Sequence, residues 1–275
     1  MSLIDAYNTI KSTLRPQVQG TCGLYSFYNA VQILRQIDAS LPSVPAPKKS
    51  EAAPGATQSL RQFAKRELKS GQGEILSEAE MQAFIKAWGY RSEAAGVATG
   101  SGKQDFLTTQ TRGGHPVLIA YLADSDSTGI VPVPNAAAGD PGAHWSLVIG
   151  TKAKDMLVVE PNDPGNLRTW PMEGVMLANA AADSKKFDRF WEKTVIKPNA
   201  KLLRSDPGFQ LPKDQSVGIA PLPNATGWAP SSGPYPQDPK YLVQDKTRLY
   251  DLGGLTGSRQ DRQKLAHVMV ALLPP

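Results

Sequence analysis

Cysteine is almost absent from this sequence, whose 275 residues include one, Cys22. A single cysteine excludes an internal disulfide framework and any zinc or iron–sulfur site built from several thiolates. Histidine is nearly as scarce, with three residues. Any thiol or imidazole chemistry therefore depends on this one cysteine and these three histidines, and we expect no metal and no cofactor.

Long apolar runs are also missing. No window approaches the roughly 20 apolar residues that a helix needs to cross a bilayer. The first residues, MSLIDAYNTIKSTLRPQ, contain no apolar core of signal-peptide length. We therefore expect a protein that is made and folds in a reducing cytoplasm and has no membrane partner. Any export would have to use a pathway that needs no classical signal peptide.

Basic residues outnumber acidic ones, 30 to 25, and the net charge is +5. They are scattered along the chain, whereas a nucleic-acid surface needs basic side chains gathered on one face with aromatic platforms among them. The charge is better explained by solubility, and we expect no nucleic-acid partner.

The segment 17–26, QVQGTCGLYS, places the cysteine between small residues and directly before an apolar helix. Apolar residues from Leu24 to Leu34 share one helical face, and the helix is predicted to start around Thr21–Gly23. A helix N-terminus favours the thiolate, which is the nucleophilic form of cysteine. Cys22 is therefore the candidate nucleophile; the alternative is a cysteine that only fills space.

The other elements are predicted from periodicity and turn residues. Two helices are expected over about 58–69 and 78–88, and Ser77 and Glu80 open the second in capping-box spacing. The pattern then changes to strands, with a buried strand at 116–123 and an antiparallel hairpin made of 144–150 and 156–161. Weaker signals follow: strands at 167–170 and 190–196, a short helix starting near Pro171, and a helix or strand at 264–273.

This order of elements predicts an α+β fold. Its N-terminal helical part, with the cysteine helix, packs on an antiparallel β-sheet that carries a histidine. Residues 1–200 are expected to form the domain with this fold, which contains Cys22. Residues 201–275, rich in proline and glycine, are expected to be an extension that wraps the same domain.

A thiol nucleophile needs an imidazole, and His144 is the strongest candidate. It follows the loop AAAGDPGA and opens a strand whose apolar residues can hold it rigid. His115, which also precedes a strand, is the fallback, and His267 is expected to be structural. We expect the partner of His144 to accept the Nδ1 proton and to leave Nε2 facing the thiol.

That partner can be sought by counting along the hairpin. Residues of equal parity lie on one face of a sheet. With the turn centred near 152 or 153, His144 faces Glu160 in one register and Asn162 in the other. Asp163 has the opposite parity, so it qualifies only if the strand has already ended.

The candidate oxyanion donors lie just upstream of the nucleophile. Gln17 and Gln19 precede Cys22 by five and three residues, and the backbone N–H of Cys22 at the helix start is a further donor. The alternative is that both glutamines are plain surface residues.

The segments QVQGTCGLYSFYNAVQIL, HWSLVIG and MLVVEPND together resemble the papain-like cysteine peptidase superfamily. The likeness is strongest to the bacterial group related to the leader-peptide peptidases of bacteriocin exporters. That group has a glutamine, a Cys-Gly that opens a helix, a histidine that begins a strand, and an Asp or Asn about sixteen residues further on. The offset lands on Glu160, and the resemblance therefore favours Glu160 over Asn162.

The chain also departs from the family pattern. In the QGxCG motif of papains a second cysteine follows and is the nucleophile, whereas here that position is Tyr25. The spacing from glutamine to cysteine is shorter than the usual one, which makes Gln17 the favoured oxyanion residue and Gln19 its rival. The resemblance covers roughly residues 15–170.

The resemblance implies a cysteine protease that cleaves peptide or isopeptide bonds with the triad Cys22, His144 and Glu160, assisted by Gln17. A stand-alone catalytic domain with no signal peptide and an unfamiliar tail would also suit a bacterial effector or toxin enzyme. We expect a monomer that acts on a protein or peptide substrate. The same site could instead deamidate glutamine or transfer acyl groups. A different class is a binding module with the same fold and an inert Cys22.

Overall fold

The computed structural model describes residues 1–17, 21–47, 59–67, 75–96, 100–126, 129–134, 142–182, 219–221, 228–230 and 265–275. The helices are α1 (Leu3–Ile10), α2 (Cys22–Ile37), α3 (Leu60–Glu67), α4 (Glu78–Ala87), α5 (Gly100–Arg112) and α6 (Met172–Ala180), with a 3-10 turn at Lys11–Thr13. The strands are β1 (Arg91–Ala94), β2 (Val117–Asp126), β3 (Gly129–Pro132), β4 (Gly142–Lys152), β5 (Asp155–Val159), β6 (Leu167–Pro171), β7 (Ile219–Pro221), β8 (Trp228–Pro230) and β9 (Met269–Leu273).

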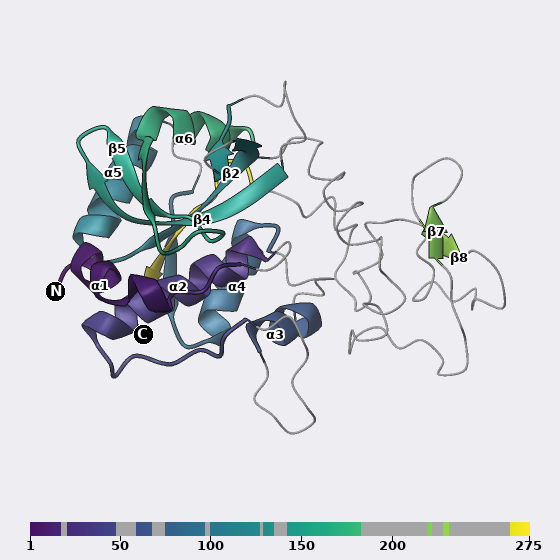
Figure 1. Ribbon diagram of the computed structural model, residues 1–275, viewed down its shortest axis with the longest axis horizontal. Coiled ribbons are helices and arrows are strands. Elements are labelled where there is room, and N and C mark those ends of the chain that lie inside the picture. Colours follow the sequence, from purple (N-terminus) through teal and green to yellow (C-terminus); the bar gives the residue numbers. More distant parts are fainter. Residues whose placement is uncertain are drawn as a thin grey trace.

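One antiparallel sheet organises the described part of the chain (Figure 1). Its strand order is β1-β9-β2-β4-β5-β6, and β3 pairs with β2 beside this path. The central pair joins β2 to β4 over a long ladder, in which Tyr121 lies opposite His144. Strands β7 and β8 form a separate two-stranded ladder.

Helices cover both faces of the sheet. Helices α1, α2 and α4 pack on one face, and α5 and α6 pack on the other (Figure 1). Strand side chains alternate between these two cores, as the pleat of a strand requires. In β2, Leu118 and Ala120 face the α2 side, whereas Ile119 and Tyr121 face the α5 and α6 side.

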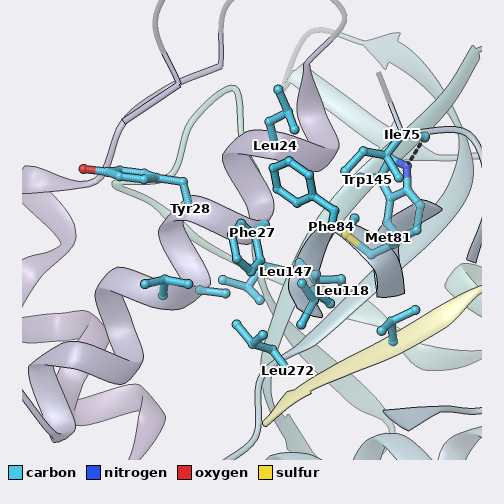
Figure 2. Packing of buried hydrophobic residues seen from close by; sticks show 14 of the residues in the cluster. Leu24, Phe27, Tyr28, Ile75, Met81, Phe84, Leu118, Trp145, Leu147 and Leu272 are labelled. Atoms are coloured by element: carbon cyan, nitrogen blue, oxygen red, sulfur yellow. Dashed lines mark hydrogen bonds between the residues drawn. The ribbon is translucent and has the colours of Figure 1, made fainter. Parts of the chain in front are cut away.

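The core on the α2 side fixes the helix against the sheet. Phe27 of α2 meets Phe84 of α4 edge to face, with ring centroids 5.2 Å apart. Trp145 of β4 lies in the same cluster and donates its indole N–H to the carbonyl of Ile75 at 2.9 Å (Figure 2). These contacts connect α2 and β4 to each other through α4 and the residues that precede it.

The predicted α+β class is confirmed, with the cysteine helix packed on an antiparallel sheet that carries His144. The helix predicted to start around Thr21–Gly23, those predicted at about 58–69 and 78–88, and the hairpin are present as α2, α3, α4 and β4–β5. Only half of the predicted capping box forms: Ser77 accepts from the Glu80 N–H at 3.1 Å, but the Glu80 carboxylate accepts from the Leu76 N–H at 2.7 Å. Helices α1 and α5 and strand β1 were not predicted, although Leu3, Ala6 and Tyr7 of α1 are buried at helical spacing. Residues 190–196 lie outside the described residues.

The end of the chain corrects the expected domain boundary. Strand β9 lies inside the sheet, where Ala271 pairs with both Glu93 of β1 and Val117 of β2. Residues 265–275 therefore belong to the main sheet and do not form part of an extension around it. The local sequence left a helix or a strand open for this segment, and the structure assigns a strand.

Asn179 ties this last strand to the rest of the fold. Its amide group donates to the carbonyls of Ala120, at 2.6 Å, and Val268, at 3.1 Å, and its side-chain oxygen accepts from the Lys103 amine at 3.2 Å. Its own carbonyl accepts from the His267 N–H at 3.0 Å. Asn179 and Lys103 are both buried, and burial lowers the pKa of Lys103. A single side chain thus connects α5, α6, β2 and the segment leading into β9.

Replacing Asn179 with alanine is expected to lower the free energy of unfolding by about 2–4 kcal/mol, because two carbonyls and one amine lose a partner inside the core. Urea unfolding followed by circular dichroism measures this change. Leu177→Ala, on the exposed side of the same helix, is the matched control. If Asn179→Ala costs no more than the control, the connection contributes nothing to stability.

Candidate active site

Helix α2 presents Cys22 in its first turn, next to β4. Cys22 is partly exposed. One turn further on, the Ser26 hydroxyl donates to the carbonyl of Trp145 at 3.2 Å. A Cβ on Gly23 would come within 3.3 Å of both Ile75 and Trp145, which is a tight contact, so glycine at this position eases the close approach of the helix start to the strand. These contacts hold the start of α2 against Trp145 and therefore close to His144, the residue directly before it in β4.

His144 and Glu160 form a buried pair. The His144 Nε2–H donates to Glu160 Oε1 at 2.7 Å, and the two residues are 7% and 2% exposed. Asn162 donates twice to the same carboxylate, from its backbone N–H to Oε2 at 3.0 Å and from its side-chain amide to Oε1 at 3.1 Å. Three donors therefore hold the carboxylate in the orientation that meets the imidazole.

Cys22 contacts the same imidazole. The side chains of Cys22 and His144 share a hydrogen bond. Burial lowers the pKa of His144, but the Cys22 sulfur and the Glu160 carboxylate outweigh burial and raise that pKa to about 9. A protonated imidazole next to the sulfur favours a thiolate–imidazolium pair, which is the state in which a cysteine attacks a carbonyl carbon.

The two ring nitrogens have the opposite roles from those expected. Nε2 binds Glu160, which leaves Nδ1 for Cys22. The expected assignment was wrong because counting along strands fixes which residues meet, whereas χ1 and χ2 of the histidine decide which nitrogen points each way.

The hairpin register explains how both Glu160 and Asn162 come close to His144. The ladder pairs Lys152 with Asp155 and, after an irregularity between Val148 and Gly150, Leu147 with Val159. Continued beyond β5, this register places Asn162 opposite His144. Glu160 lies two residues before Asn162, which makes it the diagonal neighbour of His144. Diagonal neighbours lie within reach of long side chains.

The remaining sequence candidates lie as follows. Gln17 is half-buried, and its backbone N–H donates to the carbonyl of Pro161 at 2.6 Å, directly after Glu160. Gln19 lies outside the described residues. Asp163 accepts from Arg168 at 2.8 Å and from the Asn166 amide. The carboxylate that contacts His144 therefore belongs to Glu160.

The two other histidines have other partners. His115 Nδ1 lies 2.9 Å from the Gln110 side-chain oxygen. His267 Nδ1 lies 2.5 Å from the Lys103 amine, and its backbone has a φ of 68°. Of the three imidazoles, the one that meets both a thiol and a carboxylate is that of His144.

Three further residues help to place the site: Ser26 and Tyr121, which were not predicted, and Gly23, which was expected only as part of the Cys-Gly pair that opens the helix. Gly23 and Ser26 carried a local signal, since both lie on the predicted helix within one turn of Cys22. Tyr121 carried none, because it meets His144 only through the pairing of β2 with β4, which lie far apart along the chain.

Within the described ranges no group of three His, Cys, Asp or Glu side chains could hold a metal ion. In the same part of the chain, no helix combines the length and apolar character that crossing a membrane requires.

No protein-family model matches the sequence, and no curated protein matches it. Among solved structures, the chain is similar to a candidate C39-like peptidase from Bacillus anthracis. The two share 12% sequence identity, the match covers 68% of this chain and 92% of the other, and the TM-score is 0.31.

Proposed function

We propose that this protein is a cysteine peptidase of the papain-like kind, which cleaves peptide or isopeptide bonds with Cys22, His144 and Glu160. The observation that carries the proposal is the continuous chain of interactions from the partly exposed residue Cys22, through one imidazole, to a buried carboxylate. Few structural roles call for a thiol, an imidazole and a carboxylate in this order at the start of a helix.

In the first half of the reaction, the Cys22 thiolate attacks the carbonyl carbon of the substrate. The tetrahedral intermediate then collapses, the imidazolium of His144 gives its proton to the leaving amine, and a thioester remains on Cys22. In the second half, His144 takes a proton from water, the water oxygen attacks the thioester, and the thiol is released with the acid product. Glu160 keeps the imidazole oriented and stabilises its charged form.

The developing oxyanion needs donors near the sulfur. The backbone N–H of Cys22 at the start of α2 is one candidate, and the side chain of Gln17 is the other. The main-chain contact between Gln17 and Pro161 supports this role, because it holds Gln17 next to the residue that follows Glu160.

We also propose the kind of partner and the location of this peptidase. The substrate is a protein or peptide, without nucleic acid or membrane, and the enzyme acts as a monomer. In this proposal it is made in the cytoplasm and acts as a bacterial effector or toxin enzyme after export without a classical signal peptide. Deamidation of glutamine or acyl transfer at the same site is the alternative that the following experiment separates from proteolysis.

Incubation of wild-type protein and of Cys22→Ala with a cell extract, followed by mapping of new N-termini, tests the proposal. New cleavage sites that appear with wild type and not with Cys22→Ala support a peptidase. Mass shifts of about one dalton on glutamine, without cleavage, replace it with a deamidase. If alkylation of Cys22 by iodoacetamide is as slow in the folded protein as in the denatured one at pH 6, the thiol is inert and the protein is a binding module.

A further inference from the structure

Behind the imidazole of His144 lies a buried aromatic side chain that the proposed mechanism does not use. Tyr121 of β2 is directly opposite His144 of β4 in the sheet. The two rings meet edge to face, with centroids 5.6 Å apart and planes at 74°. Tyr121 is fully buried, so this contact excludes water from one side of the imidazole.

Two further contacts hold the Tyr121 ring in place. Its hydroxyl lies 2.8 Å from the hydroxyl of Ser146, which is also fully buried and lies two residues after His144 on the same face of β4. On another side, Trp170 of β6 meets the ring edge to face at a centroid distance of 5.7 Å. Because β2, β4 and β6 all contribute to this arrangement, the ring has little freedom to turn away.

The imidazole needs this support at one stage of turnover in particular. Before reaction, His144 is held at both ends, by Cys22 and by Glu160. Once the sulfur has become a thioester, it no longer carries the negative charge that attracts the imidazolium, and Glu160 is the one remaining polar anchor. A ring held by a single hydrogen bond can swing about that bond, and a misplaced base activates water poorly.

We propose that Tyr121 is a positioning residue, whose ring keeps the imidazole of His144 in its catalytic orientation while Cys22 is acylated, and that Ser146 fixes the Tyr121 ring for this task. This inference rests on the proposed cysteine-peptidase function. It predicts that loss of the ring slows the hydrolysis of the thioester more than its formation.

The probe is p-nitrophenyl acetate, which acylates a reactive thiol without needing a particular peptide sequence. The Cys22 sulfur bonds to the acetyl carbon and nitrophenolate leaves, which gives a coloured burst. Water then cleaves the acetyl thioester, with His144 taking the proton, and this step sets the steady-state rate. Cys22→Ala is the reference for any reaction elsewhere on the protein.

Tyr121→Leu is expected to keep a burst with a rate within about threefold of wild type and to slow the steady state by about tenfold, the upper range for loss of one ring contact. Intact-mass measurement should then show the acetylated protein accumulating. Tyr121→Phe, which keeps the ring but loses the hydrogen bond to Ser146, should recover most of the deacylation rate and stay about twofold to threefold below wild type. Val117→Ala, in the same core and on the same strand as Tyr121, is the control for a general loss of packing.

Ser146→Ala gives a second test, because it removes one hydroxyl and leaves every ring in place. It should slow deacylation by about twofold to threefold, the effect of one lost hydrogen bond partner. If Tyr121→Leu does not fold, Ser146→Ala decides alone, and deacylation at the wild-type rate overturns the inference.

The two levels of proposal fail in different ways. If wild type shows no burst beyond that of Cys22→Ala, the peptidase proposal fails, and this inference fails with it. If wild type shows the burst but Tyr121→Leu deacylates normally, or slows acylation and deacylation equally, Tyr121 is only a structural residue and the peptidase proposal stands.

Discussion

Replacing His144 with alanine is expected to slow the alkylation of Cys22 by iodoacetamide at pH 6 by about a hundredfold. A cysteine without assistance titrates near 8.5, so only about 0.3% of such a thiol is ionised at pH 6. In the wild-type protein, burial lowers the pKa of His144, but Cys22 and Glu160 raise it by more, to about 9. The imidazole therefore keeps a positive charge beside the sulfur at pH 6. The measurement is the pH dependence of the alkylation rate, followed by intact mass.

His115→Ala is the matched control for this prediction, because it removes the same side chain at a place where the imidazole contacts Gln110 instead of a thiol. Its alkylation rate should equal that of wild type. Equal rates for His144→Ala and wild type across the pH range mean that the sulfur gains nothing from the imidazole, and the proposed ion pair would then have to be abandoned.

The raised pKa of His144 also sets the direction of two pH effects. The group takes up its proton more readily in the folded protein than in the unfolded chain, where histidine titrates near 6.5. Its contribution to stability is therefore fully present below about pH 6.5 and is lost as pH rises through about 9. Proteolysis should fall over the same upper range, because His144 then has no proton for the leaving amine.

Local features of the sequence were enough to predict the elements that carry the site. The start of α2 at Cys22 follows from an apolar face that begins directly after the cysteine, and the hairpin follows from two β-rich segments around a short polar turn. Parity along that hairpin limited the partner of His144 to Glu160 or Asn162, and both lie there, with Asn162 bonded to Glu160.

The remaining features depend on contacts between distant parts of the chain. The register includes an irregularity between Val148 and Gly150 that no residue pattern announces. Strand β9 enters the sheet between β1 and β2, although Met269 and Ile119, which pair there, are 150 residues apart in sequence. Short apolar segments of this kind form helices or strands according to the tertiary contacts they find.

Replacing Glu160 with glutamine is expected to lower kcat/KM for peptide cleavage by about tenfold to a hundredfold, and replacing it with alanine by about a thousandfold, since an imidazole without its orienting acceptor is a poor base and acid. Glutamine can still accept the Nε2 proton of His144 with its one oxygen. Its amide nitrogen then faces the backbone N–H of Asn162, which now donates to the second carboxylate oxygen at 3.0 Å. Because these two N–H groups are both donors, they repel each other, and the side chain at position 160 then holds the imidazole less firmly than the carboxylate does.

The negative charge of Glu160 should have a separate, measurable effect on the pH dependence of activity. The carboxylate helps to raise the pKa of His144, so Glu160→Gln should move the alkaline limit of activity from near 9 to lower pH. Asp163→Asn is the matched control, because it removes a carboxylate three residues away that contacts Arg168 and Asn166. A similar loss of activity and a similar pH shift in both variants would indicate a general effect of charge, whereas a change confined to Glu160→Gln identifies the carboxylate that orients and charges the imidazole.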